Sequence, residues 1–413
     1  MPTIAATPPP SRPDLVAAAT GLRPLLAAHA ERTESERRPT PENLDGLREA
    51  GLLRLTTPRD AGGHGADTRT QVDVLLELAR ACPSTAWVTA VFSGLKPMLR
   101  TFSARARGEF YADGPDTVAC SVASPNGRGL LTGDGVRISG EWPVASGCED
   151  AQWALLGVPV HPGGGDDGDR RDDADAPDGR PPRPATVLVP TADLSVRDTW
   201  HAAGMRGTGS QSLVADDALV PAHRVLSAAV AAPDDGTAAV FPAAGKLAMT
   251  LTLLAPVVGA ALGARDVVQA ALANGRGVMA TVYRRAAESP SARMWLADAA
   301  HLLDRAVGCV RDTADTLDAA LATGATMTSD PLTPLDRSRI RMGMVSAVED
   351  ARAAVSGLLD LYGTAGFSES NPLQRLWRDM ETGSRHIQFN PFITREDHGR
   401  ALLGIEPPVS LLL

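Results

Sequence analysis

The chain has 413 residues, more than one compact domain usually holds, so we expect two or three domains or packed layers. Its 44% hydrophobic and 22% charged residues are typical of a soluble globular protein, and its net charge of −9 excludes the basic surface of a general nucleic-acid-binding protein. The four cysteines lie far apart with no C-x-x-C pair, which disfavours a metal site or a disulfide framework and fits a reducing cytoplasm.

The first part of the chain is predicted to be a short disordered segment followed by helices. Residues 1–11 are rich in proline and are expected to be disordered, and they lack the basic and apolar regions of a signal peptide. The helical spacing of apolar residues predicts helices over 14–32, 70–80 and 84–102. Thr40 followed by Pro41 is typical of the start of another helix, which Gly51 ends. Residues 12–115 are therefore predicted to form a helical domain.

Short apolar runs separated by Gly, Pro and Asp follow this domain and predict strands. They cover residues 118–122, 135–139, 151–160, 185–189 and 212–214. Their spacing indicates a small barrel or sandwich, which we assign to a middle domain over 116–235. Residues 161–184 interrupt this domain with seven Asp and four Arg, a composition that predicts a disordered acidic insertion. The same composition cannot supply the fixed geometry that a cation site would need.

Helical patterns return in the last part of the chain, over 247–272, 279–285, 294–322 and 337–362. Four helices joined by short loops predict an up-down bundle, assigned to residues 236–413. Residues 247–264 carry no charge, but Pro256 and many alanines favour a buried bundle helix over a membrane span. The apolar residues around this helix exceed one core face, which predicts a dimer or tetramer. The predicted fold class is therefore α+β: a helical domain, a β domain and a helical bundle.

Five short motifs, in order along the chain, resemble the acyl-CoA dehydrogenase fold superfamily and, more narrowly, its flavin-dependent monooxygenase branch. They are LDGLREAGL at 44–52, STAWV at 84–88, GEWPVASG at 140–147, GMRGTGS at 204–210, and RLWRD at 375–379 with His386 seven residues later. The resemblance extends over residues 12–405. It implies an N-terminal helical domain, a middle β domain and a C-terminal four-helix bundle, with no metal.

The resemblance also implies a two-component, group D-like enzyme. Such an enzyme takes reduced FMN or FAD from a separate NAD(P)H:flavin reductase and binds it between the β domain and the bundle of a homotetramer. With O2, through a C4a-hydroperoxyflavin, it hydroxylates a small or polycyclic aromatic secondary metabolite. The sequence agrees that another protein reduces the flavin, because no G-x-G-x-x-G follows a strand at the start of a βαβ unit. We expect no nucleic-acid or membrane partner.

The position of a general base separates a dehydrogenase from an oxygenase. In the resembled dehydrogenases a Glu follows the Arg-Asp pair by eight residues, and here that position is Ile387. The other base position of that family falls at Leu253–Leu254, and Glu381 lies on the wrong side of its helix. This favours the oxygenase. A dehydrogenase or oxidase with a relocated base, and a non-catalytic flavin-binding relative, remain alternatives.

The resemblance assigns two catalytic residues. His386 takes the place of the active-site histidine, where a pKa near 6.5 suits proton exchange at neutral pH; the alternative is a helix-end histidine stabilised by the dipole. Ser146 resembles the serine that hydrogen-bonds flavin N5, and the alternative is a strand-end serine in a turn. The remaining predicted flavin contacts are Gly147, Ser121, Ser124 and Ser210.

One position departs from the family. Many members carry a second histidine eleven residues after the serine of the S-T-x-W motif, and here that residue is Leu95. Lys96 beside it either replaces the lost donor or is a surface lysine with a packed stem. The departure leaves open whether the oxygen chemistry or the substrate class differs.

Overall fold

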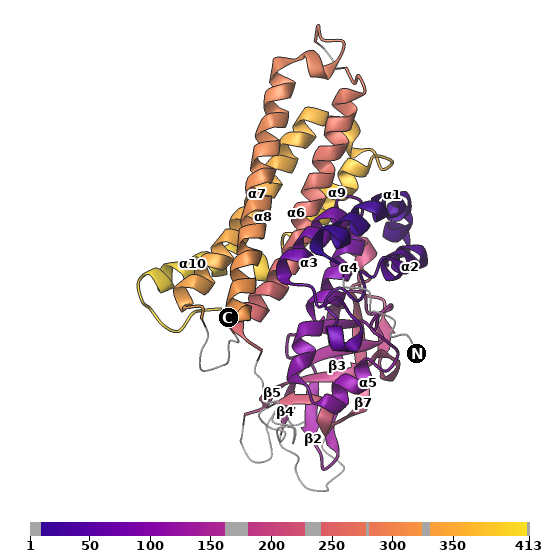
Figure 1. Cartoon of the computed structure of the whole chain (residues 1–413), viewed down its shortest axis with the longest axis vertical. Helices are drawn as coiled ribbons and strands as arrows, with labels where there is room; N and C mark the ends of the chain where they lie inside the picture. Colours follow the sequence, from indigo (N-terminus) through magenta and orange to yellow (C-terminus); the bar gives the residue numbers. More distant parts are fainter. Residues whose placement is uncertain (1–9, 162–180, 228–240, 278–280, 324–330, 411–413) are drawn as a thin grey trace, which may run out of the picture.

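The computed structural model describes residues 10–161, 181–227, 241–277, 281–323 and 331–410. Figure 1 shows the sheet at one end, three long helices reaching to the other, and the N-terminal helices beside the junction. Residues 1–9 of the predicted disordered N-terminus, and residues 162–180 of the predicted acidic insertion, lie outside the described residues.

The N-terminal region is helical: α1 (Arg12–Glu36), α2 (Pro41–Glu49), α3 (Thr68–Ala79), α4 (Pro83–Gly94) and α5 (Ala104–Phe110). Thr40 caps α2 as predicted, because its side chain accepts a hydrogen bond from Asn43 N. The single helix predicted over 84–102 is wrong. The α-helix observed there, α4, ends at Gly94. A 3₁₀ helix, η2 (Lys96–Thr101), follows it, because Pro97 lacks the N–H that an α-helix needs.

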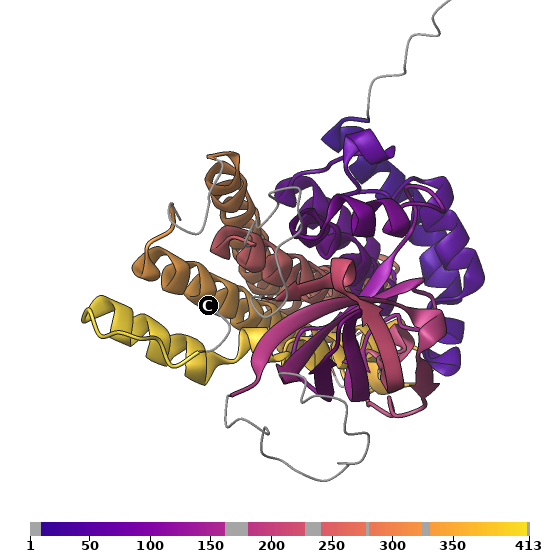
Figure 2. The same cartoon turned by 90° about the horizontal axis from the view of Figure 1, so that it is seen from below.

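The middle region forms one eight-stranded sheet, seen from below in Figure 2. Its strands are β1 (Ala119–Val122), β2 (Arg128–Leu131), β3 (Gly135–Ala145), β4 (Trp153–His161), β5 (Arg183–Pro190), β6 (Ser195–Arg197), β7 (Gln211–Pro221) and β8 (Val225–Ser227). Their order is β6-β7-β3-β2-β4-β5-β8, and β1 pairs in parallel with β4. The five predicted strands are present. β2, β6 and β8 were missed because three or four residues show no clear alternation.

The C-terminal region holds α6 (Ala243–Ala273), α7 (Pro290–Ala322), α8 (Pro334–Tyr362), α9 (Pro372–Gly383) and α10 (Pro391–Leu402). The helix predicted over 279–285 is wrong, because residues 281–285 form bends and α7 begins at Pro290 after the cap Ser289. The shorter α9, packed against α6, supplies the fourth helix of the bundle.

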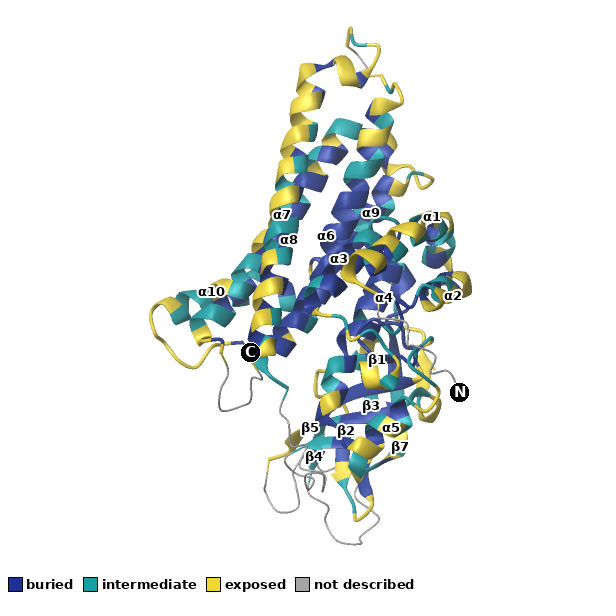
Figure 3. Ribbon diagram, viewed as in Figure 1, coloured by how far each residue is buried: buried dark blue, intermediate teal, exposed yellow. Residues whose placement is uncertain are grey.

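Helix α6 lies at the centre of the molecule (Figure 3). It is long and apolar enough to cross a membrane, but 83% of its most apolar window is buried inside the protein. It packs against α3, α4, α7, α8 and α9. Helices of the same chain therefore cover the apolar surface from which a dimer or tetramer was predicted, so α6 by itself does not indicate a second subunit.

Candidate active site

The end of β3 is distorted where it meets α4. Between Trp142 and Ala145 the pairing with β7 shifts, with three steps on β3 opposite two on β7. Val144 in this bulge has φ +62° and is 52% exposed, a strained conformation for a β-branched residue. Gly147 has φ +73°, and a Cβ there would lie 2.8 Å from Val88 and Phe92 of α4. The bulge and this glycine together place Ser146 against α4.

Trp87 of α4 joins the two predicted catalytic residues. Its Nε1 donates a hydrogen bond to Ser146 Oγ at 3.2 Å, and its ring meets the His386 ring edge-on with centroids 5.6 Å apart. The structure therefore brings Ser146 and His386, which are 240 positions apart in the sequence, to one buried tryptophan. Trp87 is not among the site residues predicted from the sequence, although its place in the STAWV motif was a signal.

His386 follows α9 and caps the 3₁₀ helix η8 (Ile387–Phe389). Its Nδ1 accepts a hydrogen bond from Gln388 N at 3.4 Å, so the neutral ring carries its hydrogen on Nε2. Burial lowers the pKa of His386 to about 4. Trp87 and Phe389 pack around the half-buried ring, so its pKa lies below the usual value near 6.5 and the imidazole is neutral at pH 7.

A row of three buried hydroxyls, which we name the hydroxyl chain, runs from Ser146 through Ser210 to Thr208. The Ser146 and Ser210 Oγ atoms lie 2.7 Å apart, and Ser210 Oγ lies 2.6 Å from Thr208 Oγ1. Thr208 Oγ1 donates to the carbonyl of Met205 at 2.8 Å. Ser210, a predicted flavin contact, is thus the hydrogen-bond partner of Ser146.

Helix α9 fixes the loop that carries the hydroxyl chain. Asp379 accepts a hydrogen bond from Met205 N at 2.6 Å and one from Ser84 Oγ at 3.3 Å. Burial raises the pKa of Asp379 to about 6. A Cβ on Gly204 would lie 2.0 Å from the carbonyl oxygen of Arg378, so only glycine allows this close approach. Asp379 is not among the site residues predicted from the sequence, although it belongs to the RLWRD motif.

The other predicted flavin contacts lie at the end of β1. Ser121 is half-buried on the strand and Ser124 is exposed in the turn after it. Neither hydroxyl has a hydrogen-bond partner within the described part of the chain, and neither touches Ser146 or His386 through a hydrogen bond. Both remain free to meet a ligand.

The surface position considered for Lys96 is wrong. The residue is 1% exposed, and its Nζ donates to Leu53 O at 2.6 Å, Thr57 Oγ1 at 2.8 Å and Pro115 O at 3.2 Å. These three oxygens replace the water that burial removes from the amine. Because the hydrogens of this amine are directed at these three oxygens, Lys96 does not replace the second histidine. Leu95 packs in an apolar cluster with Leu99 and Phe102.

The positions of a dehydrogenase base offer no carboxylate. Ile387 is 57% exposed and Leu254 is fully buried. Glu381 is paired with Arg352 at 3.2 Å and with Arg385. The buried carboxylate of Asp379 is occupied by Met205 N and Ser84 Oγ. The geometry therefore favours the oxygenase over the dehydrogenase.

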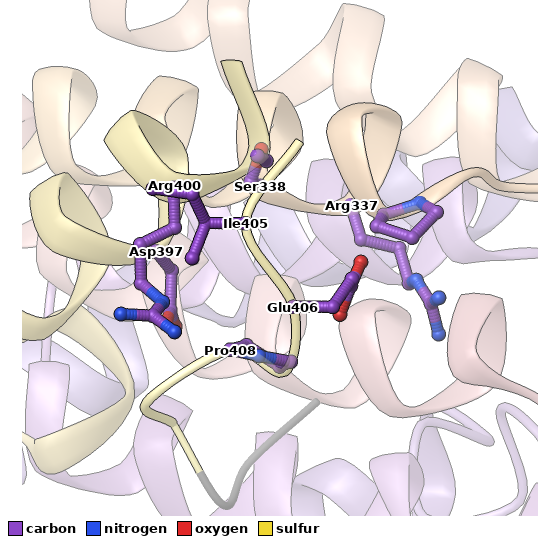
Figure 4. Close-up of a pocket in the computed structure, with 9 residues that line it drawn as sticks. Arg337, Ser338, Asp397, Arg400, Ile405, Glu406 and Pro408 are labelled. Carbon is purple, nitrogen blue, oxygen red and sulfur yellow. The ribbon is translucent and has the colours of Figure 1, made fainter. Parts of the chain in front are cut away.

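A separate cavity of about 190 Å³ lies between α8, α10 and the C-terminal segment (Figure 4). Ser338, Arg400 and Asp397 line it, and none of the predicted site residues does. Asp397 pairs with the buried Arg341 at 3.0 Å and accepts a hydrogen bond from Val409 N at 2.8 Å. The cavity thus borders the contact that fastens the C-terminal segment to the bundle. Among the described residues, no cluster of three His, Cys, Asp or Glu is arranged for a metal.

The residues around Ser146 fit a flavin. The Ser146 oxygen has a lone pair to spare beside the buried ring of Trp87, and the bulge at Val144 two residues earlier is partly exposed, so a neutral hydrogen-bonding group lies next to an aromatic ring. Together with the three-part fold, they define a flavin-binding protein of the acyl-CoA dehydrogenase fold that lacks a base at the dehydrogenase positions.

Comparison with known proteins agrees. Residues 18–110 match the family model for the acyl-CoA dehydrogenase N-terminal domain, and residues 251–391 match that for the C-terminal domain. The chain is 34% identical to the oxygenase component of the FADH(2)-dependent resorcinol hydroxylase of a Rhizobium strain, over 95% of each chain. It is 31% identical to the flavin-dependent monooxygenase oxygenase subunit HsaA of Rhodococcus jostii, over 90% of this chain and 93% of the relative. The chain therefore belongs to the flavin-dependent monooxygenase branch of the acyl-CoA dehydrogenase family.

A solved structure supports the same assignment. XiaF from a Streptomyces species, in complex with FADH2 and glycerol, has a TM-score of 0.86 and 30% identity, covering 97% of this chain and 98% of its own. The predicted fold class, the oxygenase activity of a two-component flavin-dependent monooxygenase and the reduced flavin cofactor are confirmed.

Proposed function

We propose that this protein hydroxylates a phenolic ring, using O2 and reduced FAD delivered by a separate NAD(P)H:flavin reductase. The observation that carries the proposal is the meeting of Ser146 and His386 on Trp87, in a site with no carboxylate at the dehydrogenase positions. The choice of FAD and of a phenol draws on relatives named for FADH(2), resorcinol and p-hydroxyphenylacetate.

The proposed roles follow from the hydrogen bonds. Bound reduced flavin supplies the electrons that activate O2, and Ser146 contacts its N5. Gly147, Ser121 and Ser124 border the flavin. His386 uses Nδ1 to hold the turn at Gln388, so its Nε2–H donates to the oxygen of the substrate. A hydrogen bond that stabilises a phenolate there enriches the ring in electrons and favours attack by electrophilic oxygen.

Rapid mixing tests this function. Protein holding reduced FAD is mixed with O2 and resorcinol, and hydroxylated product is measured per flavin oxidised. We expect product to form only in the presence of the protein. Hydrogen peroxide alone, across a panel of phenols, would contradict the proposal. Reduction of bound oxidised FAD by an acyl thioester would instead support the dehydrogenase.

We also propose a homotetramer, or at least a dimer. Large apolar side chains are exposed beside the site and on the last helix: Ile387, Phe392, Leu402 and Leu403, with Phe392 84% exposed. Exposed apolar side chains of this size are typical of an interface between subunits. Light scattering should give two or four times the 43.0 kDa chain mass, and Phe392→Asp should lower it. A stable monomer at micromolar concentration would contradict this.

A cytoplasmic location is proposed from the cysteines. All four are unpaired, and Cys82, Cys120 and Cys148 are buried. Free thiols of this kind persist in a reducing compartment. Fractionation of the producing cells tests the location, and recovery outside the cytoplasm would contradict it.

A further inference from the structure

The direction of every hydrogen bond in the hydroxyl chain follows from counting hydrogens. The carbonyl of Met205 can only accept, so Thr208 spends its single hydroxyl hydrogen there. Ser210 must therefore donate to Thr208, across 2.6 Å. Ser146 must in turn donate to Ser210, across 2.7 Å.

A further contact, from Trp87, favours this direction. Trp87 Nε1 donates to Ser146 Oγ, which makes that oxygen an acceptor from the α4 side. If the chain ran in reverse, the Ser146 hydrogen would have no acceptor among the described residues, and one hydrogen bond would be lost. Ser146 therefore has no hydrogen to offer a ligand and keeps one lone pair.

The carbonyl of Met205, at the far end of the hydroxyl chain, is held in a fixed orientation. Met205 N is held by Asp379 at 2.6 Å, and Met205 O also accepts from Trp200 Nε1 at 2.8 Å. Ser146, Ser210 and Thr208 are all buried, so bulk water does not compete for their hydrogen bonds. The direction in which the Ser146 hydroxyl donates is thus set by the carbonyl of Met205.

We propose that the hydroxyl chain makes Ser146 an acceptor toward flavin N5, and that the site thereby selects reduced over oxidised flavin. N5 carries a hydrogen in the reduced isoalloxazine and a bare lone pair in the oxidised ring. The N5–H of the reduced form can donate to Ser146 while every bond of the hydroxyl chain is kept. The oxidised form can accept from Ser146 only if the hydroxyl chain reverses, which costs Met205 O its hydrogen bond from Thr208. The inference rests on the proposed contact of Ser146 with N5. Thr208 and Ser210 act through Ser146 and are positioning residues.

Thr208→Val is the direct test. Valine keeps the shape of threonine, and Met205 O retains the hydrogen bond from Trp200. Ser210 loses its acceptor, so Ser210 can donate to Ser146, and Ser146 becomes a donor. The measurement is the dissociation constant of FAD, oxidised and anaerobically reduced, from tryptophan fluorescence. The wild type should bind reduced FAD more tightly, and the ratio of the two constants should fall about tenfold in the variant, the scale of one hydrogen bond.

Matched variants make the test specific. Ser210→Ala frees the Ser146 hydrogen by another route and should also lower the ratio, which provides a second variant if Thr208→Val folds poorly. Ser212→Ala removes a buried hydroxyl that pairs with Thr199 at 2.9 Å and does not belong to the hydroxyl chain. This control should leave the ratio of the two dissociation constants unchanged. In a Ser146→Ala background, Thr208→Val should have no further effect on the ratio.

The outcomes separate the inference from the function. If wild-type protein binds reduced FAD but folded Thr208→Val and Ser210→Ala shift the ratio by less than about twofold, the inference is overturned and the proposed function stands. If the wild type binds neither form of FAD, the proposed function fails as well.

Discussion

His386→Ala should slow hydroxylation by about 10²-fold or more, the usual scale for removing a hydrogen-bond donor that stabilises negative charge in the transition state. Reduced FAD should still bind, because Ser146 and the backbone around Gly147 remain in place. Oxygen should still oxidise the flavin, but hydrogen peroxide should replace hydroxylated product. The measurement is product formed per flavin oxidised.

Two further variants distinguish a loss of catalysis from a loss of folding stability. His386→Asn keeps a side-chain acceptor for Gln388 N, so the turn at η8 should survive, but the shorter amide does not reach the position of Nε2. It should lose product yield as the alanine variant does while remaining stable. His201→Ala, at an exposed histidine, should change neither property. Normal product yield in His386→Ala would show that the residue is only the cap of η8.

The pH dependence of His386 is a related expectation. Its pKa is about 4 in the folded protein and near 6.5 in the unfolded chain. Between these values the unfolded state binds more protons, so the free energy of unfolding should fall as the pH drops from about 6.5 to 4. NMR titration of the His386 ring should show a midpoint well below 6.5. A midpoint near 6.5 would contradict the burial of the ring.

Lys96→Met should lower the free energy of unfolding by about 2–4 kcal/mol. Methionine fills much of the same volume, but Leu53 O then loses its donor inside the protein. Pro115 O keeps the hydroxyl of Thr57 at 2.8 Å, so the loss is centred on one carbonyl. Urea denaturation measures the effect. Lys246→Met is the control, because the other lysine of the chain is exposed at the start of α6.

This stability difference should also depend on pH. Burial lowers the pKa of Lys96 from 10.5 to about 7. Between these values the unfolded chain binds more protons, so the wild type gains stability from this group as the pH rises, and Lys96→Met does not. The gap between the two proteins should therefore widen between pH 7 and about 9.5. A gap that stays constant over this range would show that the amine remains charged, held by its three oxygen partners.

The sequence by itself determined the elements with strong local patterns. Thr40 and Pro41 predicted the start of α2, and the uncharged run around Pro256 predicted the buried helix α6. The order of five motifs indicated the family, and five of the strands followed from their apolar runs. These features rest on interactions between near neighbours, which periodicity and capping residues report directly. The interruption at Pro97 was visible in the sequence but was not used.

Only the tertiary structure decided the chemistry of the site. Ser146 and Ser210 are 64 positions apart, and Met205 and Asp379 are 174 apart, so no local pattern reports their hydrogen bonds. The burial of Lys96 depends on three oxygens from two separate segments, the loop at Leu53–Thr57 and Pro115. A pKa depends on which groups exclude water from a side chain, and the direction of a hydrogen bond depends on which acceptors surround it. Both are set only when distant parts of the chain pack together.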